Sequence, residues 1–344
     1  MMTSLREFCR TGREALPPES GQSRRWLLAG PACLAVVSMA LLTACGGGTS
    51  QVEVFKPARV VILGDESSVI VDDGKADGFK YGINDRTATT AGKCQVLPTF
   101  SQSVLTLYGY VTKECNPNAV TPKAEIQARV NGRVEDATTG LTAQVARVTG
   151  GLSKTDLVTV MMGVNDVIAV YERFRNGQLT LAQAVAESQR LGTVTAAAVN
   201  AILGTGARAL VFTIPDMSLS PYATAQETAK AGAKAALASM SYEFNAFLRT
   251  RIDPTKYDGR NYGLILADDI VTAMHISPTS FLLSPYNVTT AACTTTSVVN
   301  CLTTTLQTDA GTNTHLWASD RHLGPEAHVR IGSQAQARAA NNPF

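Results

Sequence analysis

Residues 157–166 read Leu-Val-Thr-Val-Met-Met-Gly-Val-Asn-Asp, an apolar and β-rich run that ends abruptly in Gly-x-Asn-Asp. Such a run is typical of a buried parallel strand. Ligands of open α/β sheets bind at the carboxyl ends of the strands, so Asn165 is a candidate site residue. A strand followed by a polar turn occurs in almost any α/β protein, and the interpretation therefore depends on other segments.

Three further segments support this interpretation: the first ends in hydroxyl groups, the second is another apolar run, and the last supplies an acid and an imidazole. Residues 58–63 form another strand-like run, which ends in Gly-Asp-Glu-Ser-Ser at 64–68. Residues 206–214 form a third apolar run, closed by Pro215. Near the C-terminus, Asp320 and His322 stand just before a helix-like tail. Serine early, asparagine in the middle and aspartate with histidine late is an ordered set of catalytic residue types.

This set resembles the SGNH/GDSL hydrolase family from about Pro57 to the C-terminus. The resemblance implies an α/β fold, namely a flavodoxin-like three-layer α/β/α sandwich with a mostly parallel central sheet, and esterase or lipase activity. Less specific features of the resemblance are Ile-Pro-Asp at 214–216, a helix-like stretch at 242–248, and Pro285, Tyr286, Asn287 and Cys293 near the C-terminus.

Two catalytic blocks depart from the family pattern. The family has Gly-Asp-Ser in its first block, whereas this chain has Glu66 in the third position, followed by Ser67 and Ser68. The family's last block is Asp-x-x-His, but here Ser319 stands three residues before the histidine and the acid only two before it. Either the turns carry one-residue shifts that restore the geometry, or the machinery is degraded.

The resemblance implies acyl transfer from an ester to water. Ser67, or failing that Ser68, is expected to attack the ester carbonyl, while His322 moves the proton and Asp320 orients the imidazole. Asn165 and the backbone N–H of Gly132 are the expected oxyanion donors. If Glu66 enters the site instead, it could orient His322 or activate water. The mechanism needs no cofactor.

A rival interpretation is a non-catalytic surface lipoprotein that keeps the cleft to bind a glycan or an acylated ligand. Glu66 and Ser319, which occupy the family's nucleophile and acid positions, favour this alternative. For the enzyme, the expected substrate is a small-molecule ester or a glycan ester such as an acetylated polysaccharide.

The N-terminus is expected to be an export signal. Arg24 and Arg25 precede an apolar segment, residues 26–42, that is too short and too interrupted by Pro and Gly to favour a permanent membrane span. Leu-Thr-Ala-Cys at 42–45 resembles a bacterial lipobox, which predicts cleavage before Cys45, lipid attachment to its thiol and a membrane anchor. The residue after Cys45 is not Asp, which favours the outer over the inner membrane in a bacterium with two membranes. An ordinary signal peptide with an incidental Cys45 is the alternative, and the paired arginines also resemble a twin-arginine export motif.

The expected organisation is a signal peptide at 1–44, a lipidated cysteine and flexible tether at 45–56, and one hydrolase-like domain at 57–344. The chain has 344 residues and 45% hydrophobic content, which suits a single large α/β core. The net charge of +2 equals the excess of five arginines over three glutamates in residues 1–44. The rest of the chain is neutral, so charge gives no argument for a nucleic-acid partner.

Four cysteines remain when Cys9, Cys33 and Cys45 are assigned to the signal and the anchor. An exported chain enters an oxidising compartment, so disulfides are expected between Cys94 and Cys115 and between Cys293 and Cys301. A metal site is the alternative, but the chain has no C-x-x-C pair and its four histidines are dispersed. The acidic stretch at 72–77 does not match an EF-hand and is interpreted as a solvated turn.

Hydrophobic periodicity places the remaining elements. Strands are expected at 56–63, 157–162, 206–214 and 263–267, and helices at 98–108, 141–149, 181–203 and 223–251. Residues 277–314 are rich in Thr, Ser and Asn and are expected to form a surface loop near His322 that shapes the entrance to the site. His328 matches a structural histidine of the family, and the sequence assigns no role to His275 or His315.

Overall fold

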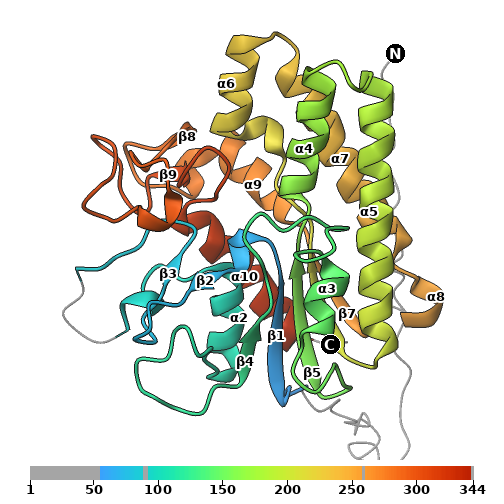
Figure 1. Ribbon diagram of the computed structural model, residues 1–344. Helices are drawn as coiled ribbons and strands as arrows, with labels where there is room; N and C mark the ends of the chain where they lie inside the picture. Colours follow the sequence, from blue (N-terminus) through green and yellow to red (C-terminus); the bar gives the residue numbers. More distant parts are fainter. Residues whose placement is uncertain (1–54, 88–91, 258–259, 342–344) are drawn as a thin grey trace, which may run out of the picture. The chain divides into compact units, whose positions relative to one another are not determined.

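A computed structural model describes residues 55–87, 92–257 and 260–341 of the chain (Figure 1). The expected signal peptide, the lipidated Cys45 and most of the expected tether lie outside the described residues. No helix within the described ranges is both long enough and apolar enough to span a membrane.

A five-stranded parallel sheet forms the centre of the domain (Figure 1). Its strands lie in the order β4 (Ala124–Ile126), β1 (Arg59–Gly64), β5 (Asp156–Met161), β6 (Arg208–Phe212) and β7 (Tyr262–Ile265). Counted by their sequence order, these five strands are arranged 2-1-3-4-5, which is the flavodoxin-like arrangement. The predicted fold class is confirmed.

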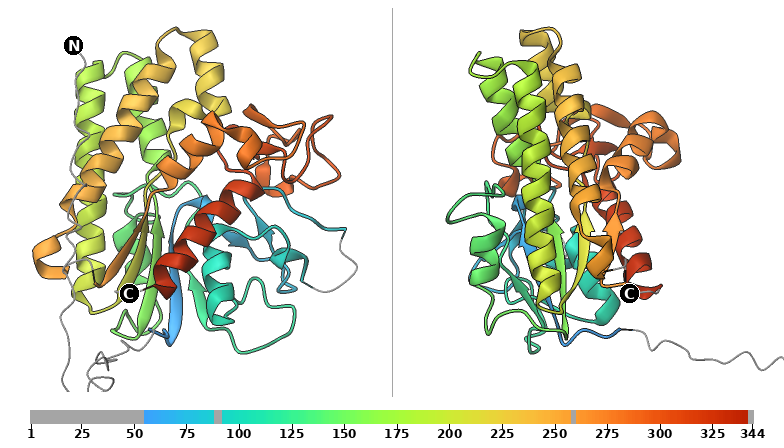
Figure 2. Two further views of the ribbon diagram at one scale, coloured as in Figure 1. Left: turned by 180° about the vertical axis from the view of Figure 1, so that it is seen from behind. Right: turned by 90° about the vertical axis from the view of Figure 1, so that its right-hand side faces the viewer.

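Helices cover both faces of the sheet, as the two views of Figure 2 show. Val61 and Leu63 of β1 point into one apolar cluster, whereas Val60 and Ile62 point into the other. The first cluster is completed by α3 (Leu141–Ala146), α4 (Val164–Arg175), α5 (Leu181–Gly204) and α7 (Ala233–Arg251), and the second by α2 (Phe100–Tyr108), α9 (Ala267–Ile276) and α10 (Pro325–Ala340). Strands buried on both faces need continuous apolar sequence, which is why these runs are recognisable.

The remaining elements are short. They are η1 (Glu66–Ser68), β2 (Ile70–Val71), β3 (Phe79–Lys80), η2 (Lys93–Gln95), η3 (Met217–Leu219), α6 (Pro221–Ala229), α8 (Pro254–Tyr257), η4 (Pro278–Ser280), β8 (Asn287–Ala291), η5 (Val298–Asn300) and β9 (His315–Trp317). Strands β2 and β3 pair antiparallel, and β8 and β9 pair parallel. The segment 277–314 is therefore not only a loop, because β8 lies within it.

One element was missed by the sequence analysis, and one expectation is wrong. The edge strand β4 was not predicted, because three residues are too few to show a period of two. The single helix expected at 223–251 is two helices, α6 and α7. The backbone is extended at Lys230 and left-handed at Gly232, with φ of 90°, so the helical hydrogen bonds cannot continue across this point.

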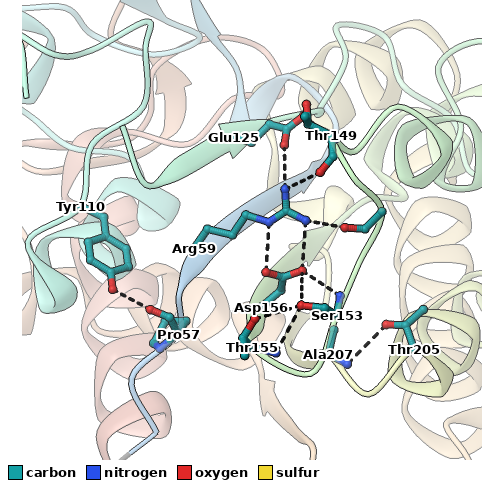
Figure 3. Close-up of polar contacts among 11 residues, drawn as sticks. Pro57, Arg59, Tyr110, Glu125, Thr149, Ser153, Thr155, Asp156, Thr205 and Ala207 are labelled. Atoms are coloured by element: carbon teal, nitrogen blue, oxygen red, sulfur yellow. Dashed lines mark hydrogen bonds and ion pairs between the residues drawn. The ribbon is translucent and has the colours of Figure 1, made fainter. Parts of the chain in front are cut away.

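A polar cluster ties three strands together at the amino end of the sheet (Figure 3). The Arg59 guanidinium at the start of β1 donates from Nε to Asp156 Oδ1 (3.0 Å) and from Nη1 to the Thr149 carbonyl (2.6 Å), and it lies 3.5 Å from a Glu125 carboxylate oxygen. Asp156 also accepts from the Ser153 N–H (2.8 Å). These contacts link β1 to β4 and β5 at the edge opposite the carboxyl ends of the strands.

Both predicted disulfides are confirmed. Cys94 bonds to Cys115, and Cys293 bonds to Cys301. The second disulfide lies close to the His322 loop, because the Cys293 N–H donates to the Ala318 carbonyl (2.9 Å). The expectation that the segment 277–314 lies beside the His322 loop is therefore confirmed.

Candidate functional site

The site begins where β1 ends at Gly64. The φ of Gly64 is +141°, and a Cβ atom there would lie 2.1 Å from the Met161 carbonyl oxygen, so only glycine fits. The Asp65 carboxylate then accepts from the Ser67 N–H (3.0 Å) and starts the short turn η1. This turn directs the Glu66 side chain inward, where it is only 5% exposed.

The Glu66 carboxylate is held by two N–H donors. Its Oε2 accepts from Asn165 Nδ2 (2.8 Å) and from the backbone N–H of Asn131 (2.9 Å). Its other oxygen, Oε1, lies 3.5 Å from His322 Nε2. The carboxylate thus lies between the imidazole and the pair of donors.

Asn165 reaches this point because β5 ends directly before α4. Gly163 precedes the helix with φ of +139°, and Asn165 lies in its first turn. Its Nδ2 also donates to the Gly132 carbonyl (3.2 Å), which fixes the orientation of the amide. Strands β1 and β5 are the neighbours between which the strand order reverses, and ligands of such sheets bind at this switch point.

Ser319 holds the other side of the imidazole. Its Oγ lies 2.6 Å from His322 Nδ1 and accepts from the backbone N–H of His322 (3.2 Å). Its hydroxyl also reaches Asp320 Oδ1 at 3.2 Å. When Nδ1–H donates to Ser319 and the hydroxyl donates to Asp320, the ring is oriented with Nε2 facing Glu66, where Nε2 can hold or release a proton.

The electrostatics of the site keep Glu66 charged. Burial raises the pKa of Glu66, but the neighbouring His322 imidazole, together with the hydrogen bond from Asn165, outweighs burial and holds the pKa below its ordinary value. Two other buried carboxyl groups near Glu66, those of Asp65 and Asp166, have raised pKa values instead. Burial and the charge of Glu66 raise the pKa of Asp65 to about 8, and burial raises the pKa of Asp166 to about 7.

The structure does not bring either predicted nucleophile to the imidazole. Among the described residues, the half-buried Ser67 makes no side-chain hydrogen bond to His322. The Ser68 hydroxyl is buried and has no hydrogen-bond partner in the described ranges. The residue that faces Nε2 is Glu66, in the unshifted third position of the block. The one-residue shift that would have restored a serine is therefore not present.

Two further assignments need correction. The Gly132 N–H donates to the Arg129 carbonyl (3.1 Å) rather than toward the site, and the backbone donor in the site is the preceding residue, Asn131. The Asp320 carboxylate is half-exposed and binds Ser319 and Arg321, so it acts on the imidazole only through the Ser319 hydroxyl. Ser319, three residues before the histidine, is the group that contacts the ring.

Three contributions were missed by the sequence interpretation. Asn131 adopts a left-handed conformation with φ of +56°. The Asn-Gly pair at 131–132 was the local sequence signal for such a turn, whose N–H points into the site. The Tyr81 ring lies 5.9 Å from the His322 ring, centroid to centroid. The Arg321 guanidinium lies over the Tyr222 ring and beside the Asp320 carboxylate.

These groups open into a cleft of about 700 Å³. Its lining includes Glu66, Asn131 and His322, together with Arg321 and the disulfide-bonded Cys293. The cleft thus joins the ends of the central strands to the disulfide-bonded loop, as expected for the entrance to a site.

The described residues hold no group of three or more His, Cys, Asp or Glu side chains placed to bind a metal ion. In the acidic stretch at 72–77, Asp72 and Asp73 accept backbone N–H groups of their own turn. Among the other histidines, His328 is buried against Phe100, whose N–H it accepts at 3.4 Å, and burial lowers its pKa to about 3. His315 hydrogen-bonds to Thr314 (2.9 Å).

Comparisons with solved structures find hydrolases. The chain is similar to a phospholipase A1 from Streptomyces albidoflavus NA297 (13% identity, TM-score 0.41, covering 83% of this chain and 100% of that one). It is similar to an extracellular lipase from Streptomyces rimosus (14%, 0.41, 83% and 100%) and to a putative arylesterase from Agrobacterium tumefaciens str. C58 (13%, 0.36, 81% and 97%). No protein-family model and no curated protein matches the chain. The fold assignment accordingly rests on the sheet and helices described above.

Proposed function

We propose that this protein hydrolyses ester bonds in the cleft, with the Glu66 carboxylate and the His322 imidazole in place of a serine–histidine pair. The observation that carries the proposal is the position of the carboxylate, 3.5 Å from Nε2 and bonded to two N–H donors. A charged carboxylate, an oriented imidazole and fixed N–H donors are the elements of hydrolytic catalysis.

Each side chain has a definable part in such a reaction. His322 is oriented through Nδ1 by Ser319, so its Nε2 is directed to Glu66 and the cleft. Glu66 is ionised at neutral pH, because its pKa lies below its ordinary value. The pair can therefore take a proton from water and return it to a leaving alcohol, and general acid–base catalysis of this kind contributes about 10²–10⁴ in rate.

One observation favours a second candidate, which is a protein that binds a glycan or an acylated ligand without turnover. The Oε2 atom of Glu66 accepts the hydrogen bonds of both Asn165 Nδ2 and the Asn131 N–H, so neither donor is free to hold the oxyanion of a substrate. Loss of one such donor costs about 10²–10³ in rate, so a site with both donors filled has a much weaker means of stabilising acyl transfer.

Hydrolysis of 4-nitrophenyl acetate by the purified protein tests the proposal. We expect turnover that falls at least about 10²-fold in Glu66→Gln and in His322→Ala. Glu326→Gln, the same replacement on α10 outside the cleft, is the matched control and should keep the wild-type rate. If the wild-type protein shows no turnover but binds a glycan or an acylated ligand saturably, the second candidate, a binding protein, is the function.

The predicted serine mechanism is tested in the same series. Fluorophosphonate labelling of Ser67 or Ser68, with activity that survives Glu66→Gln, would overturn the part given to Glu66. We expect no serine label, because the described contacts place neither hydroxyl on the imidazole.

We also propose that the protein is exported and anchored to the outer membrane through Cys45, and that its substrate is a small-molecule ester or a glycan ester. The lipobox-like sequence at 42–45 supports the anchor. The disulfides Cys94–Cys115 and Cys293–Cys301 support export, since such bonds persist in oxidising compartments.

A further inference from the structure

The proposed function leaves one difficulty at the oxyanion donors. Asn165 Nδ2 and the Asn131 N–H both donate to Glu66 Oε2. If water attacked the carbonyl of a bound ester, the developing charge would lie on a substrate oxygen that neither donor contacts. These donors are instead aligned on an oxygen of the protein itself. If an ester of Glu66 itself were hydrolysed, its Cδ would become tetrahedral and negative charge would develop on Oε2. The two donors would then stabilise that charge.

We propose that Glu66 is the nucleophile, and that its Oε1 atom attacks a saturated carbon of the substrate to form a glutamyl ester. This inference goes beyond the proposed function, because it gives the same site a covalent reaction at a saturated carbon and a different substrate class. The two carboxylate oxygens are differentiated by their contacts. Oε2 is fixed by two donors, whereas Oε1 has no N–H donor among the described residues and lies next to His322 Nε2.

The first step is a displacement at carbon. A lone pair of Oε1 forms the new carbon–oxygen bond while the bond from that carbon to the leaving group breaks, and the leaving group departs with the electron pair as an anion. Carboxylate side chains form covalent intermediates of this kind. Arg321 lines the same cleft; its Nε and Nη2 donate to Asp320, and its remaining N–H groups would be the donors for the departing anion. The substrate class is therefore an alkyl compound with an anionic leaving group, such as an alkyl sulfate or an alkyl halide.

The second step regenerates the carboxylate. Nε2 of His322 takes a proton from water, and the water oxygen attacks Cδ of the glutamyl ester. Negative charge develops on Oε2, where Asn165 and Asn131 already donate. The intermediate then releases the substrate alcohol, which carries away the former Oε1 and receives the proton from His322. Glu66 keeps the oxygen from water and loses the remaining proton of that water to solvent, which restores the carboxylate. The net reaction converts the alkyl compound and water into an alcohol, the leaving-group anion and a proton, and it consumes no oxidant, reductant or cofactor.

Isotope transfer distinguishes this path from direct attack by water. A single turnover of 4-nitrobenzyl bromide is run in ¹⁸O-labelled water with the full-length protein in excess, and the Glu66 peptide and the 4-nitrobenzyl alcohol are analysed by mass spectrometry. The proposal predicts ¹⁸O in Glu66 and unlabelled oxygen in the alcohol formed by the enzyme. The reaction without protein gives the background of labelled alcohol.

A trapping experiment tests the same intermediate by another readout. In His322→Gln, the second step should slow at least about 10²-fold, so the 4-nitrobenzyl ester should accumulate on Glu66. The adduct should be absent from Glu66→Gln and present at the wild-type level in Glu326→Gln.

The outcomes separate the two proposals. Labelled alcohol above background, with no label and no adduct on Glu66, would overturn the nucleophile while leaving ester hydrolysis to the acetate assay. An adduct or label on Glu66, without turnover of 4-nitrophenyl acetate, would support the nucleophile and restrict the substrates to alkyl compounds. If neither probe reacts at Glu66 and neither is turned over, both proposals fail.

Discussion

Replacement of Asp65 by Asn should change how the stability of this protein depends on pH. The Asp65 carboxylate is 1% exposed, its Oδ1 accepts from the Ser67 N–H (3.0 Å), and its Oδ2 has no hydrogen-bond partner in the described residues. Burial and the neighbouring charge of Glu66 raise its pKa from 3.8 to about 8. In the unfolded chain neither influence acts, and the pKa returns toward the ordinary value.

The sign follows from the protons bound in each state. Between the unfolded and folded pKa values, the folded protein holds one more proton at Asp65 than the unfolded chain does. Stability from this group is therefore present in full below about pH 4 and is lost as the pH rises through about 8. The slope is about 1.4 kcal/mol per pH unit, so roughly 4 kcal/mol is lost between about pH 5 and about pH 8. Asn carries no charge at either pH, and Asp65→Asn should lack this loss.

Urea unfolding measured by tryptophan fluorescence gives the free energy of unfolding, since Trp317 is fully buried. The advantage of Asp65→Asn over wild type should grow across the pH range, while contributions from other groups cancel in the difference. Asp72→Asn is the matched control, because the exposed Asp72 also accepts the N–H two residues ahead (2.8 Å to Gly74). Parallel profiles for wild type and Asp65→Asn would refute the reasoning.

Three other predictions concern separate parts of the chain. Gly163→Ala should lower the free energy of unfolding by about 2–5 kcal/mol, because φ is +139° and the new Cβ would lie 2.4 Å from the Phe244 ring. Gly177→Ala is its control: φ is +73° but the space around Cβ is open, so it should lower the free energy of unfolding by about 1–2 kcal/mol in the same urea assay. Asp156→Asn should cost about 1–3 kcal/mol by thermal or urea unfolding, since it removes the charge that Arg59 contacts through Nε and Nη2, and an unchanged midpoint would contradict this. Cys45→Ala should move the protein from the membrane fraction to the soluble fraction, and an unchanged membrane-bound fraction would contradict the predicted anchor.

Much of the fold could be predicted because its signals are local in the sequence. Strands β1, β5 and β6 are buried on both faces, so their apolar runs stand out from the turns that follow them. The disulfide pairs join cysteines only 21 and 8 residues apart, which made their pairing predictable once export was expected. The edge strand β4 and the break between α6 and α7 were missed, since three residues and one left-handed glycine leave little pattern.

The residue types of the site were also visible in the sequence, in their order along the chain. Asn165 after β5 and His322 before α10 were identified, and the structure places both around one carboxylate. The sequence by itself thus determined four of the five central strands, several of the covering helices and the segments that meet at the carboxyl ends of β1 and β5.

Only the tertiary structure decided which atoms meet there. Glu66, Ser67 and Ser68 are consecutive on one short turn, and the direction of each side chain depends on the Asp65 cap and on the Gly64 conformation rather than on residue type. The Asn131 N–H and the Ser319 hydroxyl likewise act through backbone geometry and through contacts between segments far apart in the chain. A pattern of residues predicts which groups reach a sheet edge, but the angles of the turns determine which of them touches the imidazole.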